Sequence, residues 1–175
     1  GAVLICYLKT KSLDVGMAGN GAIAGLVAIT APSGFVEYWA APIIGFLAGV
    51  FVVYCVIAIE RRLDDPVGAL SAHGMAGIWG TIAVGIFASP RLIADGAAPG
   101  IFYGIKDGDF ANSLGQLGVQ ALAVVATFTF VFVVSYAVFA ALKATIGLRV
   151  SEEEELAGLD ISTHGMYGYP ESFIP

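Results

Sequence analysis

Charged side chains are scarce in this sequence. Only 13% of its 175 residues are Asp, Glu, Lys or Arg, whereas 58% are hydrophobic and the mean hydropathy is +0.85. In soluble globular domains about a quarter of all residues are charged. Intrinsic disorder is excluded as well, because it requires low hydrophobicity. The composition therefore predicts a membrane protein or a part of one.

Basic residues are few and unevenly placed. There are 8 Lys and Arg against 14 Asp and Glu, which gives a formal net charge of −6. Residues 150–175 contain six of the acids and none of the bases, so residues 1–149 carry 8 − 8 = 0. The acidity thus belongs to a short C-terminal tail, 150–175. No face can gather enough bases to bind nucleic acid, and we expect no such partner.

Cysteine is also nearly absent. Cys6 and Cys55 lie far apart in apolar stretches, where a thiol usually packs as a small hydrophobic group. Neither has a Cys or His neighbour at the spacing of metal ligands, so we expect no disulfide, metal site or cofactor. The opening apolar run, 1–8, is too short for a membrane span and unlike a signal peptide. We therefore expect the chain to begin within a helix.

Long uncharged stretches are what the sequence does contain. Four intervals between successive charged residues, 15–36, 38–59, 66–90 and 110–142, exceed the roughly 20 residues that a helix needs to cross a bilayer core. Within them we predict spans near 17–31, 42–59, 66–88 and 112–142. Residues 1–149 are therefore expected to form an all-α, polytopic transmembrane helix bundle.

The first two spans differ in their glycines. The first is interrupted by four glycines, Gly16, Gly19, Gly21 and Gly25, and after them by Pro32 and Gly34. This leaves 20–31 as a regular helix, which is too short to cross alone and should be buried in a bundle. The second span has Pro42 near its start and the pair Gly45 and Gly49, whose spacing permits close helix approach.

The third span contains His73, the only His, Asp, Glu, Lys or Arg within any span. Asp64-Asp65-Pro66 predicts an N-cap followed by Pro at the first helical position. On an α-helix the residues that share a face with His73 are small or apolar: Pro66, Ala69, Leu70, Ala76, Gly77 and Gly80. Such a face either packs against another helix or lines a narrow cavity, and the residues leave both alternatives open.

The bases predict the orientation of the spans. Six of the eight fall on one side of the membrane: Lys9, Lys11, Arg61, Arg62, Lys143 and Arg149. By the positive-inside rule this side is cytoplasmic, which places the C-terminal tail in the cytoplasm. The connection 89–112 is then an outside loop, which we expect to tolerate change.

The stretch around the histidine, Asp-Asp-Pro-Val-Gly-Ala-Leu-Ser-Ala-His-Gly-Met-Ala-Gly-Ile-Trp-Gly at 64–80, resembles the signature of the ammonium transporter family of Amt, Mep and Rh proteins. Three more stretches, 19–30, 147–155 and 158–165, resemble the family in the same order. The resemblance implies the second half of an eleven-helix inverted-repeat fold, from the end of helix seven to helix eleven. Helices one to six, the N-terminal half, would be missing here.

The resemblance also implies a function, namely ammonium transport rather than an enzymatic reaction. His73 would be one of two histidines in a narrow hydrophobic pore that passes ammonia, with methylammonium as an analogue. Ile23 and Ala69 would line the pore wall, and Asn20 would either serve its inner mouth or cap a helix. The alternative is an ammonium sensor or assembly module with little transport of its own.

For the tail, the resemblance implies regulation. Gly158 and Asp160 match a turn of the family's cytoplasmic tail, and Ser162 stands where some relatives have a phosphorylatable hydroxyl. Ser151 and the four glutamates after it are expected to begin a helix, with the acids at the positive end of its dipole. The implied setting is a homotrimer in the plasma membrane lipid bilayer, with a PII-type signal protein as a cytoplasmic partner.

Overall fold

In the computed structural model, residues 1–168 are described, and they are helical apart from connections and one isolated bridge between Val36 and Ala88. The elements are α1 (Ala2–Thr10), α2 (Val15–Thr30), α3 (Ala40–Glu60), the π-helix η1 (Leu70–Met75), α4 (Ala76–Phe87), α5 (Ile101–Asp107), α6 (Phe110–Thr145), α7 (Glu152–Ala157) and α8 (Leu159–His164). The predicted all-α membrane helix bundle is confirmed. The chain forms two compact units, unit 1 (Gly1–Thr127) and unit 2 (Phe128–Pro175).

Within residues 1–168, three helical stretches are long and apolar enough to cross a membrane. They are Ala40–Glu60, Leu70–Phe87 and Phe110–Thr145. The apolar helix α2 has 16 residues and is shorter than a span. The 36 residues of α6 extend about 54 Å at 1.5 Å per residue, which exceeds the bilayer core.

The helix α2 begins earlier than the sequence predicts. Asp14 accepts a hydrogen bond from the Met17 backbone N–H at 2.8 Å, and the helix runs from Val15 through all four glycines. The expected start at Asn20 is therefore wrong. Packing explains the difference, because a Cβ on Gly21 would overlap the Cβ of Ala2, and a Cβ on Gly25 would lie 3.6 Å from the Gly45 carbonyl oxygen. Gly21 and Gly25 thus allow close helix contact, and none of the four glycines breaks the helix.

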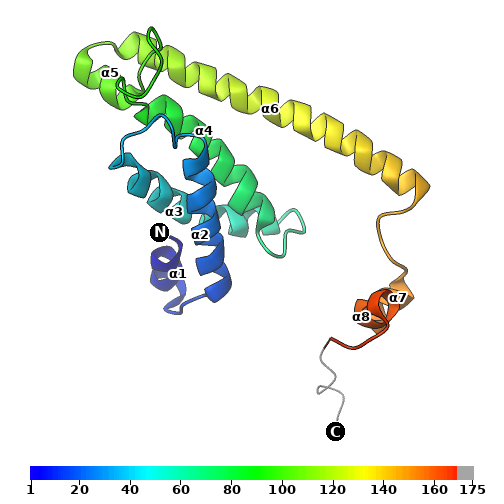
Figure 1. Ribbon diagram of the computed structural model, residues 1–175. Helices are drawn as coiled ribbons and strands as arrows, with labels where there is room; N and C mark the ends of the chain where they lie inside the picture. The colour runs from blue at the N-terminus through cyan, green and yellow to red at the C-terminus, as the bar shows by residue number, and fades with distance from the viewer. Residues whose placement is uncertain (169–175) are drawn as a thin grey trace. The chain divides into compact units, whose positions relative to one another are not determined.

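The other helices of unit 1 also pack side by side (Figure 1), and small residues lie at their contacts. Gly49 of α3 meets the backbone of α1, since a Cβ there would lie 2.9 Å from the Ala2 nitrogen. A Cβ on Gly80 of α4 would overlap the carbonyl oxygen of Ala28 in α2. On the other side of α4, the Trp79 indole N–H donates to the Ile44 carbonyl at 3.0 Å. The predicted close approach at the Gly45 and Gly49 pair is confirmed, and α2, α3 and α4 form the core of unit 1.

The connection after α4 is more ordered than expected. Ser89 is buried, its backbone N–H donates to the Phe35 carbonyl at 2.8 Å, and helix α5 lies within the predicted loop. A Cβ on Gly100 would lie 2.6 Å from the Ala88 nitrogen, so this backbone packs directly against the end of α4. The prediction of a tolerant loop over 89–112 is wrong for these positions.

Unit 2 contains the end of α6 and the two short tail helices. On α6 the rings of Phe128, Phe132 and Tyr136 stack in succession, with centroids 5.9 and 6.2 Å apart. Ser151 caps α7 as predicted, and Gly158, at φ 93°, separates α7 from α8. Residues 169–175 of the predicted tail lie outside the described residues.

Candidate functional site

His73 lies in the π-helical segment η1, which continues directly into α4. At its end the Ala76 N–H is shared between the carbonyls of Ser71 and His73. The sequence predicts an ordinary α-helix here, because the wider π-helical turn leaves no signal in the residue pattern. Short π-helical insertions occur frequently at functional sites.

The start of this helix differs from the prediction. Pro66 lies in a turn, and the helical conformation begins at Ala69, three residues later than expected. The expected N-cap role falls to Asp65, whose carboxylate accepts from the N–H groups of Ala69 at 2.8 Å and Leu70 at 3.1 Å. Pro66 therefore does not share a helix face with His73. Ala69 is four residues before His73 and remains on its side of the helix, and both side chains are exposed in this chain.

Three of the contacts between α2 and the segment that runs from Val67 through η1 into α4 show how the two lie against each other. The Asn20 amide donates to the Val67 carbonyl at 3.0 Å, a Cβ on Gly77 would lie 4.0 Å from Val27, and Gly80 meets Ala28. The contacts follow the same order along both helices, so α2 and α4 run in the same direction.

The residues predicted for the pore wall fall between these contacts. Ile23 lies between Asn20 and Val27 on α2, and His73 lies between Val67 and Gly77 on the neighbouring helix. Ile23 is 40% exposed and His73 is exposed. The structure therefore brings Asn20, Ile23, Ala69 and His73 to the two neighbouring helices at comparable heights.

Asn20 has a contact that sequence reasoning missed. Asp14 caps α2, so Asn20 is not its cap. Its bond to Val67 joins residues 47 apart in the sequence. No local pattern could have indicated this pairing.

The tail residues lie in unit 2, away from His73 in the sequence. The Asp160 carboxylate accepts from the Gly168 N–H at 3.0 Å, and the Ser162 hydroxyl donates to the Leu159 carbonyl at 3.4 Å. With Gly158 at its positive φ, they form a compact turn around α8.

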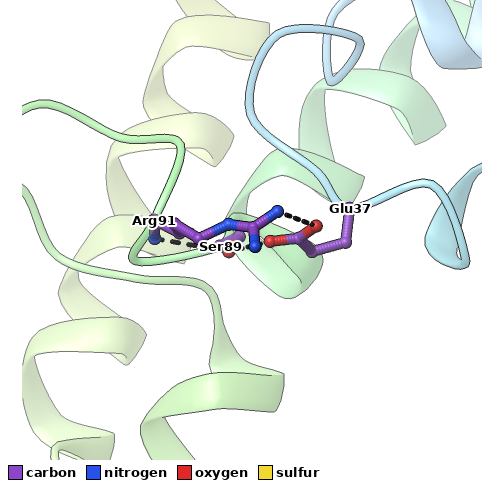
Figure 2. Close-up of polar contacts among 3 residues, drawn as sticks. All are labelled: Glu37, Ser89 and Arg91. Carbon is purple, nitrogen blue, oxygen red and sulfur yellow. Dashed lines mark hydrogen bonds and ion pairs between the residues drawn. The ribbon is translucent and has the colours of Figure 1, made fainter.

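Two further polar features were not singled out from the sequence. Ser71, two residues before His73, is buried, and its hydroxyl has no hydrogen-bond partner among residues 1–168. Glu37, which served only to delimit spans, accepts from the Ser89 hydroxyl at 2.9 Å and forms an ion pair with Arg91 at 3.0 Å (Figure 2). The sequence offered one indication that Glu37 has a structural role: it is an acid in a connection between two spans that contains no base.

A depression of about 500 Å³ lies where α3 turns toward η1. Its lining is Ile57, Glu60, Arg61, Leu63, Asp64, Asp65 and Pro66. Among residues 1–168 no group of three or more His, Cys, Asp or Glu side chains is arranged to hold a metal ion.

The comparisons with known proteins point in one direction. The sequence model described as Ammonium Transporter Family matches residues 1–169. Ammonium transporter Amt2 of Archaeoglobus fulgidus is 42% identical over 170 residues, which are 97% of this chain and 36% of the relative. The ammonium transporter of Bacillus subtilis is 36% identical over 98% of this chain and 41% of the relative. The chain thus spans about two fifths of the length of these relatives.

Solved structures agree with the fold. A structure named "Sensor Amt Protein" matches with a TM-score of 0.78 and 33% identity, over 93% of this chain and 38% of that one. The crystal structure of Saccharomyces cerevisiae Mep2 matches with a TM-score of 0.63 and 26% identity, over 99% of this chain and 39% of that one.

Proposed function

Because this chain belongs to the ammonium transporter family, we propose that it forms part of a membrane pore that conducts ammonium or ammonia. The observation that carries the proposal is the family match over residues 1–169, together with relatives that are named ammonium transporters. The proposed pore wall is formed by α2 and by the helix that starts at Ala69 and continues through η1. It is the side that presents Ile23, Ala69 and His73, with Asn20 at one end.

His73 is the proposed centre of this wall. A neutral imidazole has one donor and one acceptor nitrogen, so two such rings can pair in an apolar pore and still offer an edge to ammonia. The second histidine of the pair belongs to an N-terminal half that supplies helices one to six and completes the pore. Ammonium that enters an apolar pore loses several kcal/mol of hydration free energy, which is the order of magnitude of the desolvation penalty of a buried ion. We therefore place deprotonation before the histidines and reprotonation after them, with the released proton relayed along the histidine pair, so that one positive charge crosses with each ammonia.

The orientation follows from the bases. Lys9 and Lys11 lie at the end of α1, Arg61 and Arg62 follow α3, and Lys143 lies in the last turn of α6. The positive-inside rule then puts these ends and the tail in the cytoplasm, with the protein in the plasma membrane as a homotrimer. A PII-type signal protein would dock on this side.

In the tail, Gly158, Asp160 and Ser162 form the proposed regulatory turn. A phosphate on Ser162 would add roughly 1.5 to 2 negative charges beside Asp160 and loosen the turn. We expect Ser162→Asp to change the rate of methylammonium uptake by the complete transporter, with Ser162→Ala as the control. Equal uptake by both variants and the unsubstituted protein would contradict a regulatory role.

The sensor alternative has less support. One similar structure is that of a protein named as a sensor. The two curated relatives described above are named transporters. Transport therefore stands as the proposed function, and the tail as its regulator.

The decisive test is His73→Ala in the complete transporter, reconstituted in liposomes. We expect methylammonium uptake and its current to fall to the background of empty liposomes, because the central hydrogen-bonding group of the pore is lost. His164→Ala is the matched control, since it removes the other histidine of the chain, at the end of α8. Uptake that persists in His73→Ala would reduce His73 to a packing residue and sink the proposed mechanism.

A further inference from the structure

The turn that precedes the His73 helix is held from two neighbouring helices. On one side the Asn20 amide of α2 donates to the Val67 carbonyl at 3.0 Å. The next residue, Gly68, has φ +69°, which only glycine adopts readily. A Cβ at Gly68 would lie 2.8 Å from both the Asn20 amide nitrogen and a methyl group of Val56 in α3. The turn therefore fits between α2 and α3 without spare room.

The same turn continues directly into the helix that carries His73. The Gly68 carbonyl accepts from the Ala72 N–H at 2.9 Å, one residue before the histidine. Asp65 binds the Ala69 and Leu70 N–H groups and closes the turn from its other end. Any displacement of Val67 and Gly68 is therefore passed through one hydrogen bond to the backbone next to His73.

The π-helical conformation makes this position sensitive. A π-helical turn is rarer and less favourable than an α-helical one, so it persists where the surroundings fix both its ends. Beyond its far end, in α4, Gly80 packs directly against Ala28, with no room for a Cβ. At the near end the fixing contact across to α2 is the bond from Asn20 to Val67.

We infer that Asn20 is a positioning residue, whose amide fixes the Val67 and Gly68 turn and thereby the height of the His73 imidazole along the pore. The inference rests on the proposed function, because the role of His73 in the path is proposed there. It assigns the Asn20 amide to the protein backbone and not to the substrate. Asn20 acts on transport through Val67, Gly68 and the π-helix.

The side-chain chemistry gives a graded set of variants. Asn20→Ala removes the donor, and Asn20→Asp keeps the shape but places an acceptor opposite the Val67 carbonyl. Asn20→Ser retains a shorter donor and should restore part of the function. Asn112→Ala is the matched control, because it removes a local bond: the Asn112 amide donates to Asp109, three residues away on the surface, at 2.8 Å.

The experiment combines structure and transport in the complete transporter. Structures of each variant in lipid nanodiscs are compared with the unsubstituted protein, and methylammonium uptake is measured against concentration. We expect Val67, Gly68 and the His73 backbone to shift in Asn20→Ala, and further in Asn20→Asp. The maximal rate should fall by about tenfold to a hundredfold, the cost typical of misplacing a functional group by about 1 Å. The apparent KM should stay nearly constant, Asn20→Ser should be intermediate, and Asn112→Ala should match the unsubstituted protein.

Two results would overturn the inference. One is an Asn20→Ala structure in which Val67 and His73 keep their positions. The other is a changed KM with an unchanged maximal rate, because Asn20 would then contact the substrate itself. If His73→Ala leaves uptake intact, the proposed function fails, while the displacement in the Asn20 variants still decides whether Asn20 positions the helix.

Discussion

Ser151 and Glu154 hold the first turn of α7 through a reciprocal set of hydrogen bonds. The Ser151 backbone N–H and hydroxyl donate to the Glu154 carboxylate at 2.9 and 2.8 Å, and the Glu154 N–H donates back to the hydroxyl at 3.3 Å. The hydrogen bonds that the carboxylate accepts hold the pKa of Glu154 below its ordinary value of 4.5, and the bond from the Ser151 backbone N–H has a larger effect than the bond from its hydroxyl. The charged form of Glu154 therefore stabilises the start of α7.

This pair predicts a pH dependence of α7. Because the folded pKa of Glu154 is lowered, its contribution is present above pH 4.5 and is lost as the pH falls through the lower folded value. We expect Ser151→Ala to accelerate amide hydrogen exchange in Glu152–Ala157 at about pH 7, and to make little difference at about pH 3. Exchange followed by mass spectrometry, with Glu153→Gln as the control outside the capping box, checks this. An equal effect at both pH values would contradict it.

Among the helices, α3 and α6 were predictable from the charged residues at their ends, whereas the start of α2 and the segment η1 were not. Expected and observed ends agree closely for α3 and α6, because charged residues cannot enter the bilayer core cheaply. The start of α2 was missed because Asp14 was read only as a boundary and not as an N-cap. The segment η1 was missed because the π-helical conformation depends on its neighbours in space.

The candidate site was predictable only where a local sequence motif marks its residues. Ile23, Ala69 and His73 could be placed by motif, and the side chains of Ile23 and His73 are exposed on neighbouring helices. The role of Asn20 could not be read, since its partner Val67 lies 47 residues away and is a backbone carbonyl. Side-chain identity says nothing about which distant carbonyl a side chain will meet.

Across unit 1, Glu37 ties the connection after α2 to the connection after α4 (Figure 2). The bridge between Val36 and Ala88 and the bond from the Ser89 N–H to Phe35 lie beside it. The Glu37 side chain is 20% exposed, whereas the Arg91 side chain is 76% exposed. The partly buried bond to Ser89 should therefore contribute more than the ion pair.

This difference predicts a ranking of variants. Glu37→Ala leaves the Ser89 hydroxyl, in a residue that is 2% exposed, without its acceptor, at a cost of about 1 to 3 kcal/mol. Arg91→Ala removes a solvent-exposed ion pair, at a cost of about 0 to 1 kcal/mol. Thermal unfolding of the complete transporter in nanodiscs measures both, with Asp95→Asn as a charge-matched control in the same connection. A larger loss from Arg91→Ala than from Glu37→Ala would refute this ranking.

The contact of Gly80 with Ala28 has a mechanical consequence. Helices that touch through side chains can slide past one another as rotamers adjust, but here a glycine lies directly on a carbonyl group. A shift of α4 by one residue along its screw, about 1.5 Å with a rotation of about 100°, would replace Gly80 at the contact with Trp79 or Thr81, both of which have a Cβ. The two helices should therefore move together at this contact. The width of the proposed pore beside them would then change through rotation of side chains such as Ile23 and His73, or through a shift of the η1 backbone, and not through sliding of α4 along α2.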